Sequence, residues 1–234
     1  MPRAPHPYSV HPGVAMIQKW IEDLPAKTGR SFEEWIKFIQ REGPKDEKAR
    51  RAWLKERHGL GANTAWWLAE KASGKTMGMA EDTPEGYLAL APAYVDEQYA
   101  GKKAHLRPLY DTLLKLGLGM GADARACPCK TIVPLYREHV FAQISAPNQK
   151  RVDLALCFKN AAGIRFPKRL VPIKNDGRLT HRIEVESPAA IDDDLKLWFR
   201  RAYDHSAPKA RAATKPARAA KKKVSKKTAK VRAR

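Results

Sequence analysis

The sequence predicts an α+β protein: a small helical domain, then a domain with an antiparallel sheet flanked by helices, then a disordered basic tail. Three observations predict this class. Apolar residues recur at helical spacing through residues 14–72, and beyond Gly117 the spacing changes to the alternation of strands. Residues 207–234 carry twelve Lys and Arg and no Asp or Glu. The predicted boundaries are a disordered N-terminus at 1–13, the helical domain at 14–72, a linker at 73–84, the α+β domain at 85–206 and the tail at 207–234.

The helical domain is predicted to contain four helices. The first covers 14–24 and is expected to end at Pro25, because proline removes a backbone donor. The second begins at Ser31, which forms a capping box with Glu34. The third starts near Lys45, and the fourth covers 63–72. Helical spacing places inward the apolar residues Phe32, Trp35, Ile36, Ile39, Ala49, Trp53, Leu54, Ala65, Trp66, Leu68 and Ala69, and it exposes the cations Lys48, Arg50, Arg51, Lys55 and Arg57.

The third and fourth helices are joined by a turn rich in glycine at 58–61, which is the outline of a helix-turn-helix DNA reader. In that interpretation the fourth helix offers Asn63, Thr64 and Lys71 to DNA. Its apolar side chains favour ordinary helical packing instead. The exposed cations of the third helix fit either a solvated face or a phosphate-contacting face, and the sequence leaves both interpretations open.

The α+β domain is predicted to begin and end with helices. Helical spacing covers 84–99 and then 105–116, where five apolar residues form one stripe. A last helix follows Ser187 and carries the apolar residues Ile191, Leu195, Trp198, Phe199 and Ala202. Three consecutive aspartates at 192–194 stand in its first turn, where negative charge is favourable for the helix dipole. These aspartates are therefore interpreted as helix-capping residues and not as a metal site.

Between these helices the sequence predicts an antiparallel sheet. Short alternating runs at 131–136, 140–144 and 152–156 are separated by polar turns, which is typical of a meander. A fourth run at 180–186 alternates cleanly and places Ile183 and Val185 on the buried face. The second half is thus helix, sheet and helix in layers.

Two parts of the chain resemble known families. The strings TGRSFEEWI at 28–36 and WLKERHGLG at 53–61 resemble domain of unknown function 4287, a small helical bacterial domain, over roughly residues 14–72. The helix at Leu109, the run RVDLAL at 151–156, the run THRI at 180–183 and the closing Trp198 helix resemble domain of unknown function 5655. The resemblance implies a two-domain bacterial protein, and it brings no reaction and no catalytic residues.

Composition limits the class of protein further. The chain has 234 residues, 43% of them hydrophobic, which is enough to bury a core. No apolar run fits a signal peptide or a membrane span, so we expect a cytoplasmic protein with no membrane partner. The odd number of cysteines, Cys127, Cys129 and Cys157, fits a reducing compartment. Because no second ligand pair stands at zinc spacing, no metal is expected, and no other cofactor is indicated.

Several polar residues of the α+β domain are candidates for an anion-binding cleft. They are Lys130, Lys150, Arg151, Arg178, His181 and Arg182. Arginine binds phosphate and carboxylate in a bidentate manner, although a solvated sheet face explains the same residues. His181 and Asp153 could form an acid/base pair, but no nucleophile elbow and no paired carboxylates accompany them. The sequence therefore names no catalytic residue and favours a binding protein over an enzyme.

The tail indicates the most specific function. Its composition resembles the Lys/Ala/Pro tails of linker histones and of bacterial DNA-binding proteins with histone-like tails. Each cation that neutralises a phosphate releases counterions whatever the base sequence, so the tail predicts non-specific binding of DNA or RNA and an association with the nucleoid. Two alternatives remain: a small-anion-binding or enzymatic α+β domain with an accessory tail, and an adaptor that binds a protein partner. The predicted phosphate contacts are Lys209, Arg211, Lys215, Arg218, Lys221, Lys222, Lys223, Lys226, Lys227, Lys230, Arg232 and Arg234.

Overall fold

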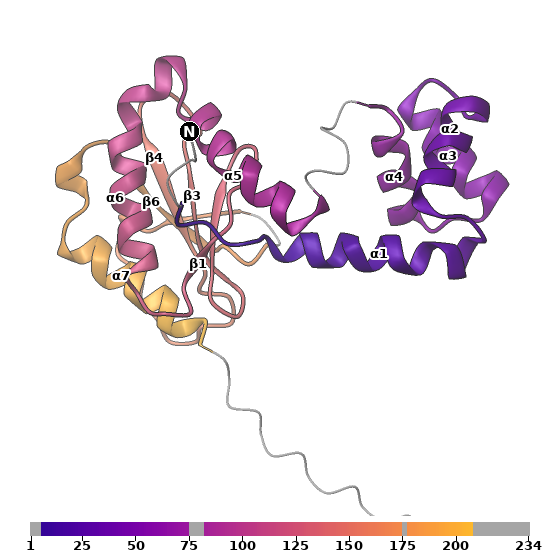
Figure 1. Ribbon diagram of the computed structural model, residues 1–234. Helices are drawn as coiled ribbons and strands as arrows, with labels where there is room; N and C mark the ends of the chain where they lie inside the picture. Colours follow the sequence, from indigo (N-terminus) through magenta and orange to yellow (C-terminus); the bar gives the residue numbers. More distant parts are fainter. Residues whose placement is uncertain (1–5, 75–81, 175–176, 208–234) are drawn as a thin grey trace, which may run out of the picture.

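The computed structural model describes residues 6–74, 82–174 and 177–207. Figure 1 shows helices α2, α3 and α4 gathered at one end and a sheet with α6 and α7 at the other, with α1 and α5 between them. The predicted α+β class, with the helical region first, is therefore confirmed. All twelve predicted phosphate contacts of the tail lie outside the described residues.

The four helices of the N-terminal region surround a core of their own. Leu54, Ala65 and Leu68 are fully buried there, together with Ile39 and the ring of Trp35. The strongest packing is between the third and fourth helices, on either side of the turn at 58–61. The helices are α1 (Pro12–Thr28), α2 (Phe32–Glu42), α3 (Glu47–His58) and α4 (Ala62–Lys71).

Two helix boundaries show how local chemistry sets the ends. The capping box at the start of α2 is confirmed: Glu34 N donates to Ser31 Oγ, and Ser31 N donates to the Glu34 carboxylate at 2.7 Å. The prediction that Pro25 ends the first helix is wrong, because α1 continues to Thr28. Pro25 stands in the last turn, where it removes only one backbone donor, and the helix ends at Gly29 with φ of 76°.

Two side-chain predictions in α3 are corrected. Arg50, predicted to be exposed, is 7% exposed and donates to the carbonyls of Pro44, Lys45 and Ala69 at 3.0–3.4 Å. Because Ala69 lies in the last turn of α4, this arginine supplies a donor to a carbonyl that the helix leaves without one. Ala49 takes the exposed position instead.

The prediction of which tryptophan of α4 faces the core is wrong as well. Trp67 is 2% exposed, whereas Trp66, predicted to be inward, is 42% exposed. Adjacent helical residues point about 100° apart, so a shift of one residue in the apolar stripe exchanges the two. Trp66 lies under the guanidinium of Arg51, at 5.9 Å from ring centroid to Cζ.

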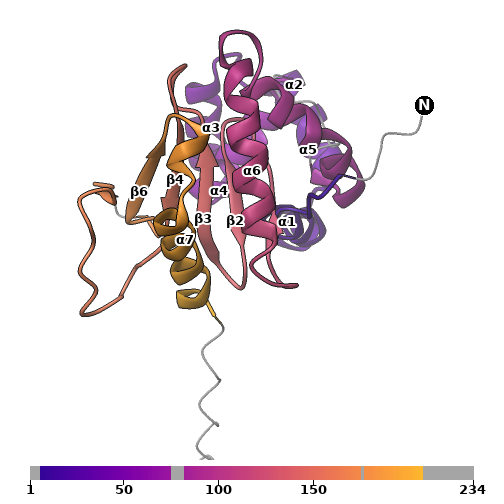
Figure 2. The ribbon, with the colours of Figure 1, turned by 90° about the vertical axis from the view of Figure 1, so that its left-hand side faces the viewer.

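The second domain is a six-stranded antiparallel sheet in the order β1-β2-β3-β4-β6-β5. Figure 2 shows α6 and α7 lying side by side across one face of it. The predicted meander and the fourth strand are confirmed as β2, β3, β4 and β6. The elements are α5 (Pro84–Gln98), η2 (Gly101–Leu106), α6 (Arg107–Leu118), β1 (Arg125–Ala126), β2 (Val133–Tyr136), β3 (Val140–Ser145), β4 (Val152–Leu156), β5 (Val171–Pro172), β6 (His181–Val185), η3 (Pro188–Ala190) and α7 (Asp193–His205).

Strand register decides which side chains face the helices. Leu154 pairs with Ile183 and both are fully buried in the core formed with α6 and α7. Asp153 pairs with Ser145 on one side and Glu184 on the other, one residue out of phase with that core. One face of the sheet is therefore apolar and covered, and the other carries polar side chains.

The edges of the sheet contain strands that alternation does not predict. β1 and β5 are two residues each, too short for a period to appear. At the β1 edge, the chain before α1 continues the sheet: Tyr8 forms a parallel bridge with Ala126, and Ser9 N donates to the Ala126 carbonyl. The Tyr8 and Tyr110 hydroxyls are 3.2 Å apart. Several of residues 6–11, such as Tyr8 and Ser9, thus have defined partners, where the sequence predicts a disordered N-terminus.

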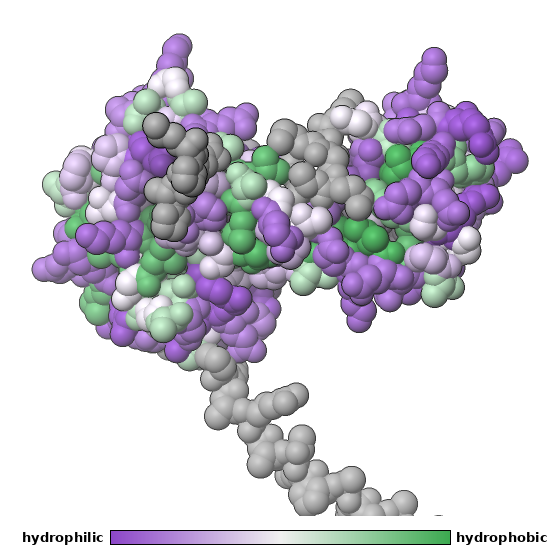
Figure 3. Space-filling model, in the orientation of Figure 1, coloured by the Kyte–Doolittle hydropathy of each residue, from purple (hydrophilic) through white to green (hydrophobic). Residues whose placement is uncertain are grey.

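Helix α1 connects the two domains. At its start, His11 Nδ1 accepts from Gly13 N at 3.0 Å, and His11 Nε2 lies 3.1 Å from the Tyr136 hydroxyl of β2. Farther along, Val14 packs against Tyr87 and Ala91 of α5. Figure 3 shows hydrophobic residues gathered where α1 meets α5 and hydrophilic residues over much of both domains.

An ion pair in the same region joins the helical domain to the start of α5. Lys71 Nζ lies 2.7 Å from the Asp82 carboxylate, and both side chains are less than a tenth exposed. The end of the predicted linker is therefore held by a salt bridge. Within the described residues, no helix combines the length and the apolar character needed to cross a membrane.

Candidate nucleic-acid interface

The described chain ends on the wall of a basic pocket. The pocket has a volume of about 440 Å³, and Ser206 and Ala207, the last two described residues, form part of its lining. The predicted tail therefore continues directly from this point. We call this cavity the tail-root pocket, and its polar lining consists of Glu138, His139, Lys159, Asn160, Arg178 and His205.

Three parts of the second domain position five of these side chains. Glu138 and His139 stand in the turn between β2 and β3, and Lys159 and Asn160 follow β4. His205 is in the last turn of α7, where its Nε2 donates to the Lys159 carbonyl at 3.0 Å. The backbone of Asn160 adopts the left-handed conformation, with φ of 64°, which asparagine tolerates better than most residues. The pocket walls are thus fixed by the sheet and by α7.

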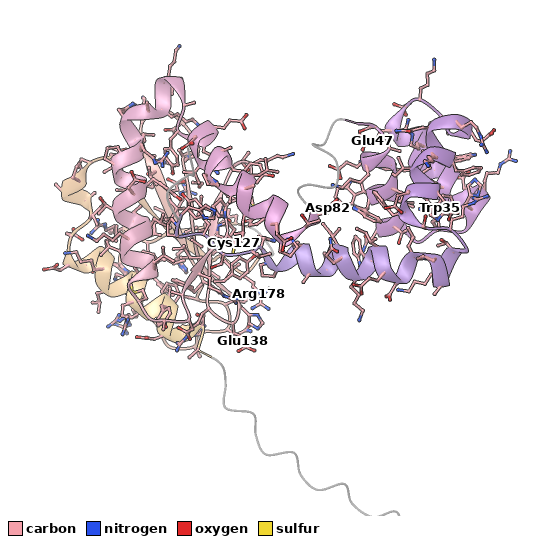
Figure 4. The ribbon with its side chains drawn as sticks, viewed as in Figure 1. Trp35, Glu47, Asp82, Cys127, Glu138 and Arg178 are labelled. Carbon is pink, nitrogen blue, oxygen red and sulfur yellow. The ribbon has the colours of Figure 1, made fainter. Side chains whose placement is uncertain are left out.

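The charge of the tail-root pocket is positive. Among the described lining residues, Lys159 and Arg178 are cations, Glu138 is the one carboxylate, and two histidines add donors. Figure 4 shows Arg178 and Glu138 at the lower edge of the α+β domain, near the point where the described chain ends. A guanidinium and an ammonium are the side-chain groups that commonly bind phosphate.

Two of the candidate anion-binding arginines are already paired with carboxylates. Arg151 lies 2.8 Å from Asp153 and 2.6 Å from Glu184, and Arg182 lies 3.0 Å from Glu184 and 3.5 Å from Asp153. The two cations and two anions balance on the polar face of the sheet. Burial raises the pKa of Asp153, against the lowering effect of Arg151. This network holds β4 to β6 and leaves no net positive charge for an anion.

The sheet separates His181 from Asp153. His181 pairs with Leu156 on the face covered by helices, and its ring stacks on Phe166 at 3.8 Å between centroids. Burial lowers the pKa of His181. Asp153 lies on the opposite face, because it pairs with Glu184, three residues along β6. The acid/base pair considered from the sequence is therefore excluded.

The remaining candidates lie apart from one another. Arg178 lines the tail-root pocket, whereas Lys130 lines a different pocket at the opposite end of β3. Lys150 is exposed in the loop between β3 and β4. The structure thus distributes the six predicted residues over five places: two pockets, one loop and the two faces of the sheet. Sequence reasoning missed Lys159 and His205, although His205 could have been noticed because it directly precedes the tail.

The cysteines and acidic residues form no metal centre in the described part of the chain. All three cysteines are free, and burial raises the pKa of the Cys127 thiol to about 12. A thiol with so high a pKa is a poor nucleophile and a poor metal ligand at neutral pH. Among the described residues no three His, Cys, Asp or Glu side chains gather as a metal site. Asp192 instead caps α7 by accepting from Leu195 N.

Fold and site define a two-domain protein with a basic pocket at the end of its α+β domain. Family models match both domains: residues 16–73 match Domain of unknown function (DUF4287), and residues 95–206 match Domain of unknown function (DUF5655). The chain therefore joins the two domains that the sequence resembles, in the predicted order. No curated protein and no solved structure gives a match.

Proposed function

We propose that this protein binds nucleic acid without sequence preference, through the cations of residues 207–234 and the tail-root pocket acting as one surface. The observation that carries the proposal is the continuity between the two: the tail follows Ala207, a lining residue of a pocket with net positive charge. Phosphates repeat along a nucleic acid, so a chain of cations and an adjacent cationic pocket can engage neighbouring phosphates. The partner is DNA or RNA, and the expected location is the cytoplasm, in association with the nucleoid.

The helical domain offers less support for a nucleic-acid contact. Arg50 is buried, Arg51 is paired with Glu47, and Lys71 is paired with Asp82. Of the cations predicted on the third helix, only Lys48, Lys55 and Arg57 are exposed. Helix α4 keeps Asn63 exposed, but the α3–α4 pair is held by Arg50 in an ordinary packed arrangement. We therefore assign the phosphate contacts to the other end of the chain.

A mobility-shift titration against duplex DNA, with RNA as competitor, tests the proposal. The full chain is compared with residues 1–206, which retain every described helix and strand. The proposal expects the full chain to bind and the shortened chain to lose at least roughly a hundredfold in affinity, because it lacks twelve cations. Equal binding by both would overturn it. Failure of both to bind, together with a protein partner that is retained after nuclease treatment, would favour the adaptor.

A further inference from the structure

A second basic pocket lies at the other end of the sheet. Strand β3 runs from Val140, which lines the tail-root pocket, to Ser145, which lines this one, a distance of roughly 17 Å at the rise of a strand. Its volume is about 670 Å³, within the range of small-molecule sites. We call it the three-lysine pocket, after Lys102, Lys103 and Lys130.

Hydrogen bonds hold the walls of the three-lysine pocket together. Gln98, in the last turn of α5, donates its Nε2 to the Cys129 carbonyl at 2.7 Å. Lys103, in η2, donates to the carbonyl of Ala146 in the loop after β3 at 2.6 Å. These two bonds connect the α5–η2 segment to both loops that form the opposite wall. The cavity is therefore formed before a ligand arrives, which lowers the entropic cost of binding.

The charges favour an anion. Among the described lining residues, three ammonium groups stand against a single carboxylate, Glu97. Lys102 is exposed and Lys103 is half-buried, so these two cations differ in their exposure to solvent. Lysine binds phosphate as a point charge and needs no fixed orientation. A ligand with one or more phosphate groups matches this arrangement.

The other lining residues favour a ligand larger than inorganic phosphate. Ile132, Ala146 and Pro147 give the cavity an apolar surface. Gln98 is 9% exposed, and its buried Oε1 has no hydrogen-bond partner among the described residues. Because this oxygen is buried, it lies behind the wall, and the cavity surface itself combines apolar contact with cations. A planar ring linked to phosphate is a chemical class with both complements.

We propose that the three-lysine pocket binds a nucleoside phosphate, with its lysines on the phosphates and its base against the wall formed by Ile132 and Pro147. This site is independent of the tail. It lies on the opposite end of β3, and none of its lining residues belongs to the tail-root pocket. This pocket gives the α+β domain a ligand of its own, whether or not the chain also binds nucleic acid.

Isothermal titration calorimetry of the full chain tests this proposal with ATP, inorganic pyrophosphate and a short oligonucleotide as separate probes. The pocket variant carries Lys102→Gln and Lys130→Gln. The matched control carries Lys37→Gln and Lys115→Gln, which remove the same charge from exposed positions on α2 and α6. Lys103 is kept, because it bonds the pocket wall. The proposal expects saturable binding of ATP at one site, tighter than that of pyrophosphate.

The two variants separate the pocket from the tail. Loss of two charge-assisted contacts is expected to weaken ATP binding roughly tenfold or more in the pocket variant and to leave it unchanged in the control. Oligonucleotide affinity should be the same in both variants. Equal ATP affinity in the two variants would overturn the proposal, because binding would then come from general charge or from the tail. Absence of saturable ATP binding, or pyrophosphate binding as tight as ATP, would overturn it as well.

Discussion

In the helical domain two arginines are part of the internal packing, whereas in the α+β domain two arginines form ion pairs and other cations line pockets at opposite ends of the sheet. Arg50 is buried against three carbonyls, and Arg30 lies over the rings of Trp35 and Phe38 at 5.0 and 4.1 Å. In the second domain, Arg151 and Arg182 balance carboxylates, and lysines and histidines line the cavities. The comparison teaches that a basic sequence is not by itself a binding surface.

The largest expected effect tests the structural role of arginine in the helical domain. Arg50→Met keeps the aliphatic packing and removes the donors to three carbonyls. Because hydrogen bonds from a charged group are each worth about 1.5–3 kcal/mol and partly replaceable by water, the variant should lose about 3 kcal/mol of unfolding free energy. Urea unfolding followed by tryptophan fluorescence measures this, since five of the six tryptophans precede residue 75.

Arg57 of the same helix is the control. It is exposed, and Arg57→Met should change the unfolding free energy by no more than about 0.5 kcal/mol. If the two variants are equally stable, Arg50 is not a structural residue, and the contrast between the domains fails.

A second variant tests how tightly the α+β domain is packed. A Cβ atom on Gly117 of α6 would lie 2.5 Å from Leu135 Cδ1 and 3.0 Å from Phe199 Cζ, and both of these side chains are fully buried. Gly117→Ala should therefore destabilise the domain by about 2 kcal/mol through overpacking. Calorimetric melting measures the change. The double variant with Leu135→Val should recover part of the loss, and no recovery would show that the strain lies elsewhere.

Much of the fold can be predicted because it depends on local periods. The stripe at 105–116, the four alternating runs and the capping box at Ser31 are all readable from neighbouring residues. The errors are of a different kind. Trp66 and Trp67 differ by one residue, and the bonds of Arg50 reach residues that are distant in the sequence, such as Ala69. Pattern alone does not distinguish these cases, because tertiary contacts decide them.

The candidate site was less predictable than the fold. Arg178 belongs to a pocket only because the segment before β6 meets the turn after β2, the end of β4 and the end of α7. The spacing of neighbouring residues does not predict such a tertiary contact. Arg151 and Arg182 have the residue type of an anion site, but the strand register places them beside Asp153 and Glu184. The composition of the tail was the one functional signal that needed no tertiary information.

A smaller effect tests whether the cations of the two domains contribute unequally to nucleic-acid binding. Lys159→Gln with Arg178→Gln removes the two permanent cations of the tail-root pocket. The slope of log affinity against log salt should become shallower by about 1 to 2, roughly one for each lost phosphate contact. Lys48→Gln with Lys55→Gln in the helical domain is the matched control and should leave the slope unchanged. Equal changes would assign phosphate contacts to both domains.

The smallest effect concerns His58, which lies among the rings of Trp35, Phe38 and Trp53. Burial, followed by the repulsion of Arg30, lowers its pKa below the ordinary value near 6.5. The unfolded chain therefore binds the proton first, and stability should be full above pH 6.5 and decrease as the pH falls from there through the folded-state pKa. Urea midpoints across this range measure the decrease, which His58→Phe should reduce. An identical pH profile in the variant would exclude His58 as the cause.

The salt dependence of duplex DNA binding tests the central claim most directly, because it counts phosphate contacts without assuming which base is read. The full chain and residues 1–206 are titrated at salt concentrations from about 50 to about 200 mM. If about six cations of the tail engage phosphates, the affinity of the full chain should fall roughly a thousandfold over this range, while the shortened chain shows only the shallow slope of the tail-root pocket. A full-chain affinity that does not change with salt, or equal slopes for the two chains, would contradict the account.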